Sequence, residues 1–215
     1  GSYQRIGPAV WQGMYVSILG GLVMLCFIPF SRSIFDVVAH DAPVRVLEAE
    51  YFEILCLGGI PSIASSALSG FFAGLGRPWP VMWVTTFSTV VNLVLDYLLI
   101  FGAWGFPEMG IKGAALASVL SAVFSLAAYG SLIATGENNR TYHTFSGWRP
   151  DKELFSRLVR YGFPSGLQFF LDMAGFAAFL LLVGRLGTTS LAATNIAFNI
   201  NTLAFMPMIG CSIAV

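Results

Sequence analysis

Charged residues are scarce in this sequence, and that scarcity limits what the protein can be. Asp, Glu, Lys and Arg make up 10% of the 215 residues, while 56% are hydrophobic. Soluble domains are typically about 45–50% apolar and about 25% charged. The mean hydropathy of +0.76 points the same way. The composition therefore excludes an ordinary soluble domain and predicts an integral membrane protein.

Several other signals are missing as well. The formal net charge is zero and no basic run occurs, so nothing favours nucleic-acid binding. The three cysteines lie in apolar segments without a CxxC pair, which predicts neither a disulfide framework nor a metal cluster. No HExxH, GxSxG or P-loop motif is found, so we expect neither an enzyme nor a bound cofactor. The sequence starts without Met or a signal peptide and stops inside an apolar run, which predicts a piece of a longer membrane protein.

Long hydrophobic stretches dominate what is present. A bilayer core about 30 Å thick needs roughly 20 apolar residues of helix. Six stretches reach that length: 9–30, 52–75, 80–104, 113–135, 161–184 and 188–215. They are too long and too uniformly apolar for β-barrel strands. The predicted fold is all-α, a polytopic bundle of six transmembrane helices.

One long polar stretch, residues 136–160, separates four of these spans from the other two. Its second half carries apolar residues on one helical face and charges opposite, which predicts a helix on the membrane surface over 151–160. We therefore divide the chain into 1–135, the linker 136–160, and 161–215. Seven of the eleven Lys and Arg residues fall on the linker's side of the membrane, which predicts a cytoplasmic linker in an inner (plasma) membrane protein.

Local spacing adds two structural predictions. Gly13, Ser17 and Gly21 recur every four residues, as do Ser66, Gly70 and Gly74, and such faces allow close helix packing. Among the prolines, Pro164 is placed in the first turn of its helix, while Pro61 and Pro207 are interior and should cause kinks.

Two carboxylates stand inside the predicted spans. Asp96 lies four residues after Asn92, so both side chains share one helical face. An ionised Asp at a helix centre costs about 2.5–3.5 kcal/mol to insert, and such residues usually face a bundle interior or a wet cavity. An amide beside a carboxylate offers oxygen ligands to a small cation such as Na⁺, or a place for a proton. The alternative is a polar clamp to a neighbouring helix.

The second carboxylate, Asp172, follows Gln168 with the same spacing. Its alternative role is a salt bridge to another helix. Asn195 and Asn199 share a face of the last span, which indicates a wet cavity or helix–helix hydrogen bonds.

Four segments together resemble the multidrug and toxic compound extrusion (MATE) family. They read IPSIASSALSGFFAGLGRPWPVM, NLVLDYLLIFG followed by GIKGAALASVLS, FPSGLQFFLDMAGF, and AFNINTLAFMPMIGCSIAV. The resemblance implies helices three to eight of a twelve-helix, two-lobe transporter, with four helices from the first lobe and two from the second. It also implies export of organic cations or amphipathic drugs in antiport with Na⁺ or H⁺.

The same resemblance assigns site residues one by one. Asn92 and Asp96 match the amide and acid of the first-lobe cation site, and Ser118 stands where the family often has Thr. Asp172 matches a second-lobe acid that is commonly Glu. Gln168, Asn195 and Asn199 are expected to line the substrate cavity.

Two other functions stay open at this point. A flippase for lipid-linked sugars shares the broad architecture, but it would need cationic residues inside the spans to hold a pyrophosphate, and none occurs there. A membrane-embedded aspartyl enzyme would have to use Asp96 and Asp172 as its carboxylate pair. The expected partners are the lipid bilayer, small organic cations and the remaining helices of the transporter, and no nucleic acid.

Overall fold

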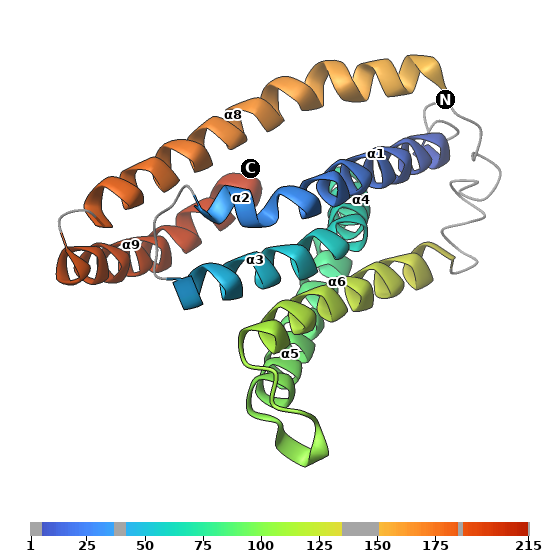
Figure 1. The fold of residues 1–215 in the computed structure, drawn as a ribbon. Helices are drawn as coiled ribbons and strands as arrows, with labels where there is room; N and C mark the ends of the chain where they lie inside the picture. The colour runs from blue at the N-terminus through green and yellow to red at the C-terminus, as the bar shows by residue number, and fades with distance from the viewer. Residues whose placement is uncertain (1–5, 37–41, 135–150, 185–186, 215) are drawn as a thin grey trace. The chain divides into compact units, whose positions relative to one another are not determined.

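The computed structural model describes residues 6–36, 42–134, 151–184 and 187–214, and these form helices without any strand (Figure 1). The predicted all-α fold is confirmed. The helices are α1 (Ile6–Phe27), η2 (Ile28–Phe30), α2 (Ser31–Asp36), α3 (Ala42–Leu57), α4 (Gly59–Gly74), α5 (Pro78–Phe101), η3 (Ala103–Gly105), α6 (Ile111–Ala134), α8 (Lys152–Gly184) and α9 (Thr188–Ala214).

Four helical segments in the described part of the chain are long and apolar enough to cross a membrane. They are Gly7–Asp36, α5, α6 and α8, and the bent pair of α3 and α4 makes a fifth. The sixth predicted span corresponds to α9, which is helical from Thr188 to Ala214 but is not in this set. The protein is a multi-pass membrane protein.

The second span differs from its prediction in where it starts and bends. Its helix begins at Ala42, ten residues before the apolar run, and turns by 52° between α3 and α4. The bend lies at Gly58, so Pro61 falls in the first turn of α4 and does not kink an interior. Helix hydrogen bonds continue through the bend, from Gly58 N to Ile54 O at 3.2 Å and from Ser62 N to Gly58 O at 3.1 Å.

The predicted surface helix and the fifth span are a single helix, α8. Its start is set by Asp151, whose Oδ1 accepts the backbone N–H of Glu153 at 2.9 Å and of Leu154 at 3.3 Å, as a helix N-cap does. Placing Pro164 in a first turn was therefore wrong, because it lies inside α8. Helical periodicity simply continues from the amphipathic stretch into the apolar one. The predicted division of the chain into domains stays a prediction.

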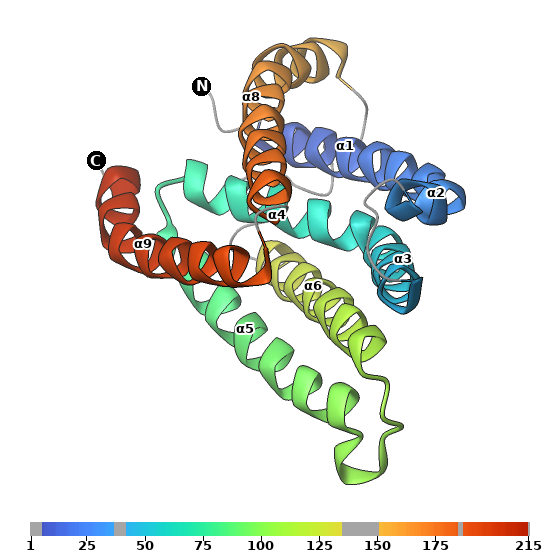
Figure 2. The same cartoon turned by 60° about the vertical axis from the view of Figure 1, so that its left-hand side comes forward.

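The chain forms two compact units, residues 1–156 and 157–215. In the first, α5 packs along α6, α1 along α4, and α4 against α6 (Figure 2). The core of this unit contains Leu68 and Phe72 of α4, Val84 of α5, and Tyr129 and Ile133 of α6. The rings of Phe72 and Tyr129 stack with centroids 5.8 Å apart.

Glycines allow α1 and α4 to approach closely, as predicted for the first of the two small-residue faces. A Cβ on Gly13 would lie 3.3 Å from Ala67 Cβ, and one on Gly21 would overlap Ile60 of α4. At Gly70 and Gly74, from the second face, an added Cβ would meet no described atom within 4 Å. The first face is therefore a packing surface of this unit, and the second is open.

Replacing Gly21 with Ala should lower the stability of the first unit. The added methyl overlaps both the side chain and the backbone of Ile60, and overpacking of this kind typically costs about 1–3 kcal/mol. Thermal unfolding in detergent, followed by circular dichroism at 222 nm, should show a lower midpoint.

The matched control is Gly70→Ala, which adds the same methyl where space is open. Because Ala favours the helix over Gly by about 0.8–1.0 kcal/mol, this variant should unfold at the same or a higher temperature. Equal destabilisation by both substitutions would contradict the packing argument.

Candidate functional site

The two polar residues of α5 that the sequence singles out, Asn92 and Asp96, are half-buried one turn apart. Neither side chain makes a hydrogen bond or ion pair within the described part of the chain. A carboxylate at this position in a span needs a partner, because leaving it unpaired in hydrocarbon is costly. The pair therefore has oxygens available for a ligand.

Two helix–helix contacts fix the register of α6 against α5. Ser88 Oγ donates to Ser121 O at 3.1 Å, and Ser125 Oγ donates to Ser88 Oγ at 2.7 Å. Toward the other end, a Cβ on Gly113 would lie 2.5 Å from Leu99 O, so the two backbones nearly touch. The helices are antiparallel, and depth along α6 can be read from these two fixed points.

This register places Ser118 at the depth of the Asn92–Asp96 pair. Ser118 and Ser125 are seven residues apart on one face of α6, the face that contacts Ser88. At 1.5 Å per residue, Ser118 lies about 10 Å from Ser125, between the depths of Asn92 and Asp96. Ser118 Oγ donates to Ala114 O at 3.1 Å, which leaves its oxygen lone pairs free to accept. An amide, a carboxylate and a hydroxyl therefore lie within about one helical turn of one another in depth, and oxygen groups of this kind are ligands for hard cations.

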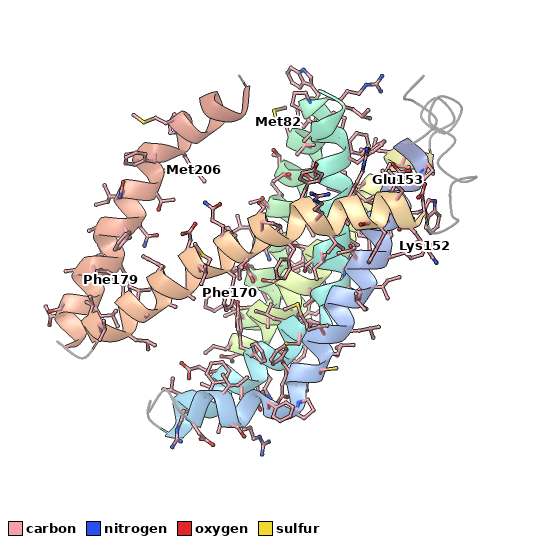
Figure 3. All side chains as sticks on the ribbon, turned by 90° about the horizontal axis from the view of Figure 1, so that it is seen from above. Met82, Lys152, Glu153, Phe170, Phe179 and Met206 are labelled. Carbon is pink, nitrogen blue, oxygen red and sulfur yellow. The ribbon has the colours of Figure 1, made fainter. Side chains whose placement is uncertain are left out.

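In the second unit, the amides of α9 line a pocket of about 430 Å³. Asn195 and Asn199 share it with Met173, Phe176, Phe198 and Thr202. The ring of Phe198 meets Phe176 edge-on with centroids 4.9 Å apart, and Phe179 at 5.9 Å. Figure 3 shows α8 and α9 diverging from their connected ends, with Phe179 close to the connection. The pocket combines aromatic rings with amides.

The structure does not bring the two remaining second-unit residues into this pocket. Gln168 and Asp172 are exposed on α8, and neither lines it, although Asp172 directly precedes the lining residue Met173. No group of three or more His, Cys, Asp or Glu that could hold a metal ion exists among the described residues.

A hydroxyl-lined groove in the first unit was not predicted from the sequence. Its volume is about 290 Å³, and all eight lining residues carry a hydroxyl: Ser65, Ser66, Ser69, Thr85, Ser88, Thr89, Ser125 and Tyr129. They come from α4, α5 and α6. The available signal was the clustering of Ser and Thr in SIASSALSG and TTFSTVVN at helical spacing.

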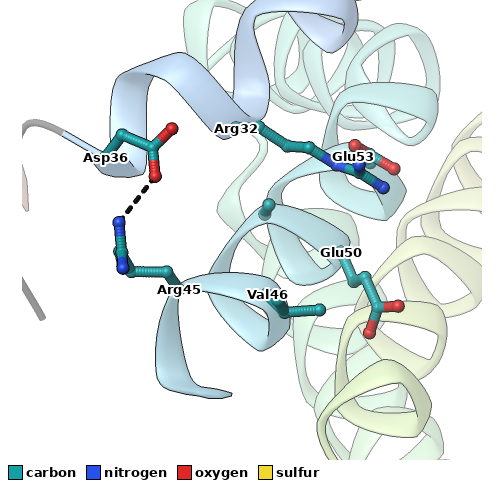
Figure 4. A pocket seen from close by; sticks show the side chains of 7 residues that line it. Arg32, Asp36, Arg45, Val46, Glu50 and Glu53 are labelled. Atoms are coloured by element: carbon teal, nitrogen blue, oxygen red, sulfur yellow. Dashed lines mark hydrogen bonds and ion pairs between the residues drawn. The ribbon is translucent and has the colours of Figure 1, made fainter. Parts of the chain in front are cut away.

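Charged residues gather in a second unpredicted pocket, of about 390 Å³, between α2 and α3 (Figure 4). Arg45 Nη1 pairs with Asp36 Oδ1 at 2.7 Å, and Ser31 Oγ donates to Glu53 Oε1 at 2.7 Å. Nearby, Lys112 Nζ of α6 pairs with Glu50 Oε1 of α3 at 2.9 Å. These contacts connect α2, α3 and α6 at one end of the unit, beyond the ends of the apolar stretches.

Comparison with known proteins places this chain in a family of membrane transporters. A family model described as MatE matches residues 1–98 and 164–215, segments that contain Asn92 and Asp96 in the first and Asp172, Asn195 and Asn199 in the second. Ser118 lies between the two matched segments.

Curated relatives agree with the family model. A probable multidrug resistance protein NorM of Agrobacterium fabrum is 32% identical over 202 residues, covering 94% of this chain and 43% of the relative. One of Bacillus cereus is 30% identical, covering 98% and 47%, and one of Thermotoga maritima is 26% identical, covering 100% and 46%. The chain spans about half the length of the curated relatives it matches. With most of its length matched by the family model, the chain belongs to the MatE family of membrane transporters.

Proposed function

We propose that this chain is part of a secondary transporter that exports organic cations or amphipathic drugs in antiport with Na⁺ or H⁺. The observation that carries the proposal is Asp96, a half-buried carboxylate inside a span, one turn from Asn92 and without a protein partner in the described structure. The names of the relatives, probable multidrug resistance proteins, supply the class of cargo.

Charge neutralisation explains how such a site would couple two movements. An ionised Asp96 in a span is unfavourable, so a bound Na⁺ or proton removes a cost of about 2.5–3.5 kcal/mol on insertion scales. Binding therefore changes the relative stability of conformations that expose or bury the carboxylate. Asn92 and Ser118 supply neutral oxygens that replace part of a cation's hydration shell. In this scheme Asp172 is the corresponding second-unit acid, with Gln168 beside it.

Recognition of the exported molecule is assigned to the pocket between α8 and α9. Phe176 and Phe198 present an edge-to-face pair, and an aromatic ring face attracts a cation by about 0.5–2 kcal/mol depending on its desolvation. Asn195 and Asn199 add donors and acceptors that do not demand a particular charge. Met173 adds a flexible apolar surface, which suits cargo of varied shape. Together these groups favour flat, amphipathic cations.

Replacing Asp96 with Asn should abolish ion-coupled efflux in the complete transporter that carries this chain. Asn keeps the size and much of the hydrogen bonding but cannot carry a charge for the ion to neutralise. Efflux of a fluorescent organic cation from cells, normalised to the amount of protein in the membrane, should fall to the background level. Asn92→Ala should cause a milder loss, because it removes one ligand and no charge.

The structural alternative predicts the opposite result. If Asp96 were only a helix clamp, Asn would replace most of its bonds, and an amide costs less to bury than an ionised carboxylate. Expression would then hold or improve. Efflux that persisted and still depended on the ion gradient would falsify the coupling role.

The orientation of the chain is also open to a direct test. We propose that the 136–160 linker is cytoplasmic, because seven of the eleven Lys and Arg residues lie on its side. A cysteine introduced at Asn139, a position outside the described residues, should react with an impermeant thiol reagent in inside-out vesicles and stay unlabelled in intact cells. The reverse labelling pattern would invert the proposed topology.

A further inference from the structure

The hydroxyl-lined groove between α4, α5 and α6 has no role in the scheme above, although it lies on the same side of α5 as Asp96. Residues Thr85, Thr89, Asn92 and Asp96 fall within about 60° of one another on the helix, at 100° per residue. Thr85 and Thr89 line the groove, and Asn92 is the next polar residue along the stripe. The stripe extends about 16 Å from Thr85 to Asp96.

The hydrogen bonds of the groove show what kind of ligand it would accept. Five of its eight hydroxyls already donate their protons: Ser65 and Ser66 to Ser62 O at 3.0 Å each, Thr89 to Thr85 O at 2.9 Å, Ser88 to Ser121 O at 3.1 Å, and Ser125 to Ser88 Oγ at 2.7 Å. A hydroxyl whose proton is used inward turns its oxygen lone pairs toward the open space. The groove is therefore rich in acceptors and carries no charged side chain.

Such a lining favours a cation over an anion and does not hold it tightly. Hard cations take oxygen ligands, and neutral hydroxyl oxygens bind them more weakly than carboxylates do. Rapid passage needs sites that an ion can enter and leave easily. A volume of about 290 Å³ also leaves room for several water molecules, each of which takes about 30 Å³ in the liquid.

The position of the groove along the helices indicates which side of the membrane it lies toward. Thr85 and Thr89 lie toward the N-terminal end of α5, Ser125 and Tyr129 toward the C-terminal end of α6, and Ser69 toward the C-terminal end of α4. These three ends lie on the side that the Lys and Arg distribution assigns to the cytoplasm. The groove therefore occupies the cytoplasmic side of Asp96.

We infer that this groove is a hydrated path for the coupling cation, Na⁺ or a proton carried by water, between Asp96 and the cytoplasm. The inference rests on the proposed function, since it gives the antiported cation its exit. It assigns Thr85 and Thr89 as weak, transient ligands of that cation.

The first test removes the hydroxyls and keeps their shape. In the complete transporter reconstituted into proteoliposomes, the double variant Thr85→Val with Thr89→Val should slow efflux of tetraphenylphosphonium driven by a Na⁺ or a pH gradient by about fivefold or more. Its equilibrium affinity for tetraphenylphosphonium should stay within about twofold of the parent protein. The matched control is Thr86→Val, because Thr86 makes the same kind of bond, to Met82 O at 2.8 Å, outside the groove.

Two results would overturn the inference. An unchanged efflux rate would show that the cation does not use the hydroxyls. A weaker affinity for tetraphenylphosphonium, with the response to the gradient retained, would make the groove a binding site for the organic cation instead. The proposed function is tested separately by the Asp96→Asn variant. If efflux by that variant still depends on the ion gradient, the proposed function fails, whatever the result at Thr85 and Thr89.

A second measurement tests hydration directly and does not depend on transport. With Cys26, Cys56 and Cys211 replaced by Ala, a cysteine at Thr89 should react with an impermeant thiol reagent added to the cytoplasmic side about tenfold faster than one at Thr86. Na⁺ at high concentration, or acidic pH on that side, should slow the Thr89 reaction if the cation occupies the groove. Equal rates at the two positions would exclude a water-filled path.

Discussion

Close contact between helix backbones at a few glycines sets the geometry on which the candidate sites depend. Gly113 allows α6 to lie against the carbonyl of Leu99, and Gly58 allows the bend of the second span to lie against Val119. In lipid there is no hydrophobic force to bring helices together, so dispersion contacts and hydrogen bonds between closely approaching backbones must do it. The α5–α6 register that results places Ser118 between the depths of Asn92 and Asp96. A side chain at Gly113 would push the helices apart and remove that alignment.

The same packing explains how so many polar groups are tolerated within the first unit. Many of its Ser and Thr hydroxyls, such as those of Ser66, Thr89 and Ser118, return their protons to a carbonyl one turn earlier, which satisfies the donor within the helix. The Ser88–Ser125 bond joins two helices, and bonds of this type in membrane proteins contribute on average about 0.6 kcal/mol. The hydroxyl groups that line the groove are therefore compatible with stable helices. Asp96 has no partner among the described residues, so it is the group whose burial would be relieved by a bound ligand.

The charged pocket at the end of α2 and α3 has a simpler role. Arg45, Asp36, Lys112 and Glu50 pair where the helices leave their apolar stretches, which is where a membrane protein meets water. Exposed ion pairs of this kind contribute little each, typically about 0–1 kcal/mol. They connect α2, α3 and α6 at one end of the unit. Polar chemistry within the first unit is thus separated into an ion-paired end and a neutral, hydroxyl-lined groove.

The sequence by itself determined the class of protein, the approximate spans and the Asn92–Asp96 pair, because hydropathy and i, i+4 spacing are local properties of one helix. The sequence-based prediction was wrong where a feature depends on contacts with other parts of the chain. The 52° bend belongs to Gly58, which is buried against another helix. Helix α8 begins directly after Asp151, because the carboxylate of Asp151 caps the helix ahead of the apolar run. Only the tertiary structure could assemble the hydroxyl groove from three helices and set the depth of Ser118 relative to Asp96, since both depend on the register between helices. That register is fixed by contacts between residues far apart in the chain, which no local pattern records.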